Sequence, residues 1–262
     1  MNTFKITLFG SNDITENCGT KALMLSELAK RGVYVPVFYG IGVEDFIRFY
    51  QGFNSKSLSD WRGELFLSKK LPEGKYMVRS SVVPKDKENS DFGSVISGAF
   101  DSYIADSSVE VPKKILEVWN SFFSEKAKEQ CALFLEDDSI LGMGVLIQKY
   151  IEPVISGVLH SDKNRCNINW TKGHLAEIVS GKIRGNIITC YQNEKKETIL
   201  RGVEANILEI MDCGYESVFI ELEQLGRKIK QELGYEIEME WLYDGKRIWV
   251  VQCQKLIGEV VL

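Results

Sequence analysis

The sequence is poor in histidine and contains no closely paired cysteines. Only two histidines, His160 and His174, occur in 262 residues, so a role that needs an imidazole has only these two candidates. The six cysteines include no C-x-x-C pair. This scatter is typical of reduced cytosolic thiols and argues against a disulfide framework or a zinc site. We therefore expect a cytoplasmic protein.

Long apolar runs and long basic runs are also absent. No apolar stretch approaches the ~20 residues that span a bilayer, and the N-terminus lacks the basic region and apolar core of a signal peptide. We expect a soluble protein that has no membrane partner. The net charge of −5 without a basic run argues against nucleic-acid binding. A chain of 262 residues with 44% hydrophobic residues can bury a core, as one large domain or two packed lobes.

The C-terminal stretch, residues 235–254, has the alternation of a half-buried strand followed by a turn and a returning strand. Asp244-Gly245 marks the turn. The first strand has an apolar face and an acidic face, formed by Ile237, Met239 and Trp241 on one side and by Glu236, Glu238 and Glu240 on the other.

The length of the turn decides which side chains oppose one another in this hairpin. A two-residue loop sets Gln252 opposite Ile237, whereas a three-residue loop that begins at Tyr243 sets it opposite Glu236. We adopt the three-residue loop, with Gly245 supplying a positive φ. One face then holds carboxylates and an amide oxygen, which are ligands that hold magnesium between a protein and substrate phosphates. The alternative is an amphipathic edge hairpin with a solvated glutamate row.

Lys21 falls in the first turn of a predicted helix. Ala22, Leu25 and Leu28 repeat at helical spacing, and Gly32 ends the helix. A lysine in a first turn is poorly placed against the helix dipole, so it either points into solvent or leans toward an anion that the helix N-terminus also attracts.

Arg79 lies near the end of a predicted strand, KYMVRSS, before a charged loop. An arginine that emerges among serines suits the clamping of a phosphate, and an ordinary surface arginine is the alternative.

The remaining pattern divides the chain in two. Helices are expected at residues 43–53, 112–124, 125–136 and 216–234, and the part from residue 143 onward is rich in predicted strands. The acidic run at residues 136–139 marks the predicted boundary between an N-terminal lobe, residues 1–140, and a C-terminal lobe, residues 141–262.

Six segments stand in a fixed order along nearly the whole chain: GTKALMLSELAKRGVYVPVFYGI, YMVRSS, SGAFDSY, VLIQKYIEPVISGVLHSD, HLAEIVSGKI, and EMEW with VVQCQ. They resemble, in the same order, motifs of phosphoenolpyruvate synthase, pyruvate phosphate dikinase and rifampicin phosphotransferase: GGKGANLAEM, VRSS, the AGQ loop, VVVQRMV, GLGE with VVSG, and DIEW with LQ.R. The resemblance implies an α+β ATP-grasp fold whose two lobes close on ATP.

The resemblance also implies roles for residues of the first lobe. Lys21 and Arg79 match the family's phosphate contacts and would be the catalytic cations. Gly98 and Ser102 match the glycine loop that covers the phosphates. These roles agree with the rule that cations lie where negative charge develops during phosphoryl transfer.

Two further sets of residues follow from the same resemblance. Gln148, Lys149, Tyr150 and Ile151 match the hinge whose backbone meets adenine, with Glu152 close to the ribose. Glu240 and Gln252 match the ligands of magnesium ions that bridge the phosphates. Glu177 matches the glutamate of GLGE, and it could equally be a surface carboxylate.

The chain departs from the family's motifs at three places. Ala22 replaces the second glycine, and the loop from Val82 to Ile96 is a few residues longer. Gln254 stands where the LQ.R motif has arginine, which removes a positive charge expected near the phosphates. Loss of one such preorganised charge costs on the order of a hundredfold in rate.

The family's phosphocarrier histidine is not matched. Neither His160 nor His174 has the serine-histidine-alanine setting of that residue, so we expect that this chain cannot complete a dikinase cycle alone. Three hypotheses remain. The chain is a nucleotide-binding half that transfers phosphoryl to a histidine on a separate swivel-domain protein, a self-sufficient ATP-grasp kinase or ligase for a small acceptor, or a non-catalytic ATP-binding module. The missing arginine fits the second hypothesis somewhat better, and the third is favoured if Gln254 abolishes turnover.

Overall fold

The computed structural model describes residues 3–52, 64–85, 98–134, 140–161, 165–174, 185–192, 198–202 and 214–257. The chain forms two compact units, Met1–Glu27 with Pro36–Tyr150, and Leu28–Val35 with Ile151–Leu262. The predicted boundary at residue 140 coincides with the start of strand β7 (Ile140–Lys149), which pairs within the first unit. The units therefore divide ten residues later than expected, because β7 belongs to the first sheet.

The first unit is built on a five-stranded sheet of order β2-β3-β7-β5-β6, in which all the paired strands are antiparallel. Its other strands are β2 (Phe9–Gly10), β3 (Phe38–Ile41), β5 (Tyr76–Pro84) and β6 (Ser102–Ala105). A parallel pair, β1 (Thr3–Ile6) and β4 (Glu64–Leu67), stands beside it. The helical elements are the 3₁₀ turns Ser11–Asp13 and Glu16–Cys18, and the helices α1 (Thr20–Lys30), α2 (Val43–Gly52), α4 (Val111–Ser121) and α5 (Glu125–Phe134).

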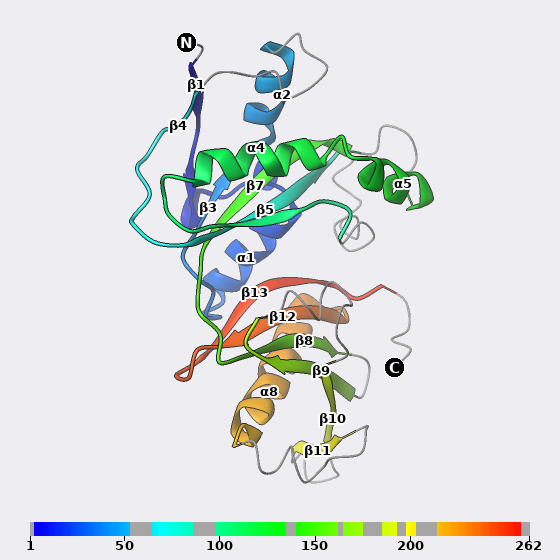
Figure 1. Ribbon diagram of the computed structural model, residues 1–262. Helices are drawn as coiled ribbons and strands as arrows, with labels where there is room; N and C mark the ends of the chain where they lie inside the picture. The colour runs from blue at the N-terminus through cyan, green and yellow to red at the C-terminus, as the bar shows by residue number, and fades with distance from the viewer. Residues whose placement is uncertain are drawn as a thin grey trace. The chain divides into compact units, whose positions relative to one another are not determined.

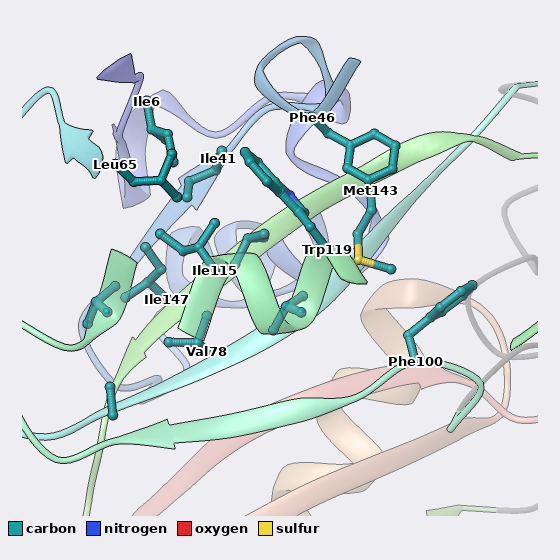
Figure 2. Close-up of a cluster of buried hydrophobic side chains, with 14 of the residues drawn as sticks. Ile6, Ile41, Phe46, Leu65, Val78, Phe100, Ile115, Trp119, Met143 and Ile147 are labelled. Atoms are coloured by element: carbon teal, nitrogen blue, oxygen red, sulfur yellow. The ribbon is translucent and has the colours of Figure 1, made fainter. Parts of the chain in front are cut away.

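The core of the first unit lies where α4 packs on β5 and β7 (Figures 1 and 2). Ile115 and Trp119 of α4 are completely buried and meet Val78 and Ile147 of the sheet in the same cluster. The helix forms because its apolar residues recur at helical spacing and a proline stands at its start, where no backbone donor is lost. Truncation of a buried tryptophan of this kind costs about 3–5 kcal/mol.

The second unit is a six-stranded antiparallel sheet of order β11-β10-β9-β8-β12-β13, with α8 (Glu216–Leu233) packed on it. Its strands are β8 (Ile155–Ser161), β9 (Arg165–Lys172), β10 (Asn186–Gln192), β11 (Thr198–Gly202), β12 (Ile237–Tyr243) and β13 (Ile248–Lys255).

One face of this sheet packs against α8. The Phe219 ring lies 5.2 Å from the ring of Trp170 and 6.5 Å from that of Trp241, measured between centroids. Gly234 ends the helix with φ +80° and donates its N–H to the Lys230 carbonyl. Since side chains alternate along a strand, the residues next to Trp241 point to the opposite face.

Most elements expected from the sequence are present, including α1, α2, α4, α5, α8 and the β12–β13 hairpin. None of the helices in the described part of the chain is long and apolar enough to cross a membrane.

Gly19, which precedes α1, gives the first testable prediction. Its φ of +85° and ψ of 168° lie in a region nearly restricted to glycine. A Cβ atom there would lie 2.0 Å from the Ser81 carbonyl oxygen. We expect Gly19→Ala to lower the free energy of unfolding by about 3 kcal/mol, as measured by urea denaturation.

Gly32→Ala is the matched control. Gly32 also has a positive φ, +78°, but a Cβ atom there would meet nothing within 4 Å. This variant should lose only about 1 kcal/mol. Equal losses for the two variants would show that the close approach to Ser81 contributes nothing.

Candidate functional site

The hairpin of β12 and β13 places Glu240 directly opposite Gln252. The predicted register was wrong, because it set Gln252 opposite Glu236. The observed hairpin pairs Tyr243 with Ile248 across a longer turn, and the register shifts between Glu240 and Trp241. Glu240 and Gln252 nevertheless share one face of the sheet, as predicted.

The bulge at Val251 produces this pairing. Trp241 pairs with Val250 and Glu240 pairs with Gln252, so Val251 is the extra residue on β13. With an unbroken register, Val251 would oppose Glu240, and Gln252 would turn to the face that packs on α8. The bulge therefore keeps the glutamine side chain on the glutamate face.

Glu240 and Gln252 are both buried, at 7% and 4% exposure. The Oε1 atom of Gln252 is buried and has no hydrogen-bond partner among the described residues. A buried acceptor without a donor is costly unless another group satisfies it. Carboxylate and amide oxygens facing each other suit a hard cation that keeps several ligands from water and phosphate. The donor set therefore fits magnesium, although no cluster of three or more acidic, histidine or cysteine ligands occurs in the described ranges.

Polar side chains continue on this face beyond the two candidate ligands. Cross-strand pairing aligns Gln254 of β13 with Glu238 of β12 and His160 of β8. The same alignment continues to Asn167 of β9 and Thr189 of β10. The Thr189 hydroxyl donates to Asn167 Oδ1 at 2.9 Å. The sequence predicted that Glu238 shares the acidic face with Glu240, but it did not predict that Asn167 and Thr189 of the neighbouring strands align with Glu238.

In the first unit, the start of α1 lies against β5. Ser81 Oγ accepts the backbone N–H of Ala22 at 3.2 Å, and Lys21 Nζ lies 3.5 Å from Ser80 Oγ. Both serines are buried. The ammonium group of Lys21 therefore lies beside the residue that follows Arg79 on β5. The two serines were quoted in the VRSS motif, but their contacts to the helix were not predicted.

Arg79 and Ser102 are cross-strand neighbours on β5 and β6. Their side chains lie on one face of the sheet, because directly paired residues point the same way. Gly98 precedes β6, is exposed and has φ +85°, and a Cβ atom there would meet nothing within 4 Å. The structure thus brings the predicted residues Lys21, Arg79 and Ser102 to neighbouring positions of the first unit.

The predicted hinge is the end of β7 and the residues that follow. The backbone N–H of Lys149 donates to the Val37 carbonyl oxygen at 2.7 Å, and that of Tyr150 donates to the Lys75 carbonyl oxygen at 3.0 Å. These two N–H groups are therefore already occupied by carbonyl oxygens of the chain. The Lys149 ammonium donates to the Glu73 carbonyl at 2.6 Å, and Gln148 is buried at 2% exposure.

Glu152 follows the hinge and is exposed. Its Oε1 atom lies 3.4 Å from His174 Nε2. Glu177, the weaker candidate, lies outside the described residues.

A family model described as "Pyruvate phosphate dikinase, AMP/ATP-binding domain" matches residues 56–257. A rifampicin phosphotransferase from Streptomyces sp is 22% identical over 204 residues, which cover 69% of this chain and 23% of that protein. An uncharacterized phosphotransferase, YvkC, from Bacillus subtilis strain 168 is 21% identical over 286 residues, covering 94% of this chain and 34% of that protein. The chain spans no more than about a third of the length of these relatives.

Solved structures with similar backbones include two enzymes. A D-alanyl-alanine synthetase A from Vibrio cholerae has a TM-score of 0.41 and 8% identity, covering 91% of this chain and 56% of that one. An L-amino acid ligase from Bacillus licheniformis has a TM-score of 0.43 and 12% identity, covering 93% and 44%.

Asp244 holds the turn of the hairpin that carries Glu240 and Gln252. Its carboxylate accepts the N–H groups of Lys246 and Arg247 and the Trp249 Nε1–H at 2.8, 2.9 and 2.9 Å. Burial raises the pKa of Asp244, but these hydrogen bonds and the Arg247 charge outweigh burial and hold the pKa below its usual 3.8.

We expect Asp244→Ala to lower the free energy of unfolding by about 1–2 kcal/mol at neutral pH. Because the folded-state pKa is depressed, this contribution is complete above the usual pKa and is lost as pH falls through the folded-state pKa. Denaturation at several pH values should therefore show wild type and variant converging below pH 3.8. Lys246→Ala, which keeps the backbone donor, is the control, and a difference that persists at low pH would contradict the assignment.

Proposed function

The chain belongs to the family of the pyruvate phosphate dikinase AMP/ATP-binding domain, and on this premise we propose that it binds ATP with magnesium and transfers a phosphoryl group from ATP to an acceptor. With this membership, the predicted α+β fold of the ATP-grasp type is confirmed. The proposal rests on one observation above all, the buried pair of Glu240 and Gln252, in which the glutamine Oε1 atom has no hydrogen-bond partner within the described part of the chain.

Glu240 and Gln252 would hold the magnesium ion. When bound, the ion neutralises charge on the phosphates to which it is coordinated. Glu240 supplies an anionic oxygen and Gln252 a neutral one, and their pairing across the hairpin fixes both backbones at adjacent positions. A strand pair holds such ligands more precisely than a loop does.

Lys21 and Arg79 would contact the phosphates of ATP, with Ser102 and Gly98 in the loop that covers them. The first turn of α1 presents the positive end of the helix dipole to an anion. Lys21 adds a full charge at this point, and Arg79 adds a second one from the neighbouring strand. Phosphoryl transfer depends chiefly on such positioning and electrostatic stabilisation. We place the adenine at residues Gln148 to Ile151 and the ribose near Glu152.

A separate protein or a small molecule would accept the phosphoryl group. Both relatives are phosphotransferases by name, which favours transfer over ligation. His160 Nε2 lies 3.0 Å from Glu238 Oε2, and His174 Nε2 lies 3.4 Å from Glu152 Oε1. A carboxylate beside each nitrogen opposes the approach of an anionic phosphoryl group. We therefore propose transfer from ATP to a molecule other than these histidines, such as a histidine on a partner protein.

Removal of either cation should weaken the complex. We expect Lys21→Ala and Arg79→Ala each to reduce Mg-ATP affinity or phosphoryl transfer by on the order of ten- to a thousandfold, because each removes a charge beside the phosphates. Calorimetric titration measures the affinity directly. Lys30→Ala, at the other end of α1, should leave it unchanged. Wild-type affinity and turnover in both test variants would overturn the phosphate role.

Glu240→Ala should abolish magnesium-dependent turnover while the fold remains intact, since the side chain lies on the polar face and away from the α8 core. Phosphorus NMR of ATP with wild type and variant, with and without candidate acceptors, measures turnover and identifies its products.

The products also distinguish the three functional hypotheses. AMP and phosphate indicate dikinase-type transfer, whereas ADP indicates a self-sufficient kinase or ligase. Binding of ATP without any turnover in the presence of acceptors would refute the phosphotransferase proposal and leave an ATP-binding module. The neutral side chain of Gln254, at the position of the family's arginine, would favour this last outcome because a positive charge expected near the phosphates is missing.

A further inference from the structure

The amide of Gln252 has two chemically different ends, and its neighbour determines which end remains available. Nε2 donates to Oε1 of Gln254 at 3.4 Å. Oε1 is buried and without a partner among the described residues. The side chain is 4% exposed, so bulk water does not readily satisfy this acceptor. Only the oxygen end of an amide can bind a cation.

The contact between Gln252 and Gln254 runs along β13, and a second contact crosses from β13 to β12. Gln254 Nε2 donates to Glu238 Oε1 at 2.7 Å. Glu238 is the cross-strand partner of Gln254, and its second oxygen, Oε2, lies 3.0 Å from His160 Nε2 on β8. A continuous hydrogen-bonded row on the polar face of the sheet therefore joins Glu238, Gln254 and Gln252.

The chemistry of the row fixes its direction. An ionised carboxylate only accepts hydrogen bonds, so Gln254 has to turn its NH₂ group toward Glu238. The carbonyl oxygen of Gln254 then faces Gln252, which has to turn its own NH₂ group toward that oxygen. Oε1 of Gln252 is thus left on the side away from the row. One carboxylate sets the orientation of an amide two side chains away.

We propose that Glu238 and Gln254 are positioning residues that hold Oε1 of Gln252 toward a divalent cation. This inference rests on the metal role of Gln252 proposed above. The reversed amide would present NH₂ to the cation, which repels it. Residues that orient metal ligands in this way typically contribute 10–100-fold to metal affinity.

The binding of Mn²⁺, followed by electron paramagnetic resonance in the presence of the β,γ-imido analogue of ATP, tests the proposal without turnover. Gln254→Leu removes the middle of the row without changing charge, and Glu238→Gln allows an NH₂ group to face Gln254 and reverse the order. We expect each variant to bind Mn²⁺ about tenfold more weakly than wild type. Glu232→Gln, on α8 at the other face of the sheet, removes the same charge and should stay within about twofold of wild type.

An exchange of the two groups separates orientation from charge. In the double variant Glu238→Gln with Gln254→Glu, a carboxylate at position 254 accepts from the amides at both 238 and 252. Oε1 of Gln252 then remains outward, and the net charge equals that of wild type. We expect the double variant to recover Mn²⁺ affinity to within about threefold of wild type, a rescue that loss of packing would not show.

The outcomes assign failure to one proposal or the other. If Gln252→Leu does not weaken Mn²⁺ binding, the metal site is wrong and the positioning role falls with it. If Gln252→Leu weakens binding but Gln254→Leu and Glu238→Gln do not, the metal site stands and the positioning role is wrong. Weak binding in both single variants without rescue by the exchange likewise overturns the orientation mechanism, provided that thermal melting shows all proteins folded.

Discussion

The pairing of Glu240 with Gln252 depends on one extra residue in β13. Because Val251 is accommodated as a bulge, two requirements are met at once: Val250 pairs with Trp241, which points to the α8 side, and Gln252 pairs with Glu240 on the polar side. A strand without the bulge could satisfy only one of these requirements, since a shift of one residue reverses every side chain. The apolar core of the second unit and the proposed metal ligands are therefore set by the same local irregularity.

The first unit meets a comparable constraint at the start of α1. Gly19 allows the chain to pass so close to the Ser81 carbonyl that no other residue fits without a shift. The close approach brings Lys21 beside Ser80. A lysine at a helix N-terminus opposes the macrodipole by some tenths of a kcal/mol to about 1 kcal/mol. The same arrangement becomes favourable when an anion lies in front of both the lysine and the helix end. The position of Lys21 at the helix N-terminus therefore explains both its local cost and its proposed phosphate role.

The sequence predicted what depends on local periodicity. The spacing of apolar residues identified α1, α4 and α8, and the alternation in β12 identified which face carries the carboxylates. It did not predict the register, because Asp244-Gly245 suggests a short turn whereas the hairpin closes at Tyr243 and Ile248 and contains a bulge. Composition placed the boundary before β7, since that strand is as apolar as those that follow, and composition does not reveal which sheet a strand joins. The contacts of Ser81 with α1 and of Gln254 with Glu238 join distant or cross-strand positions, which no local pattern encodes.

Gln254 replaces the arginine of the family's motif, and the same residue hydrogen-bonds two neighbours on the polar face of the sheet. An arginine has five donors and no acceptor, so at this position it could not receive the NH₂ group of Gln252. A glutamine can accept from Gln252 and donate to Glu238 at once, as observed here. Compared with the family motif, the chain thus lacks one positive charge and has instead a side chain that hydrogen-bonds both Gln252 and Glu238. Under the proposed function, neutralisation of the phosphates would then fall to Lys21, Arg79 and the metal, so the orientation of a neutral metal ligand would matter more in this chain than in one that retains the arginine.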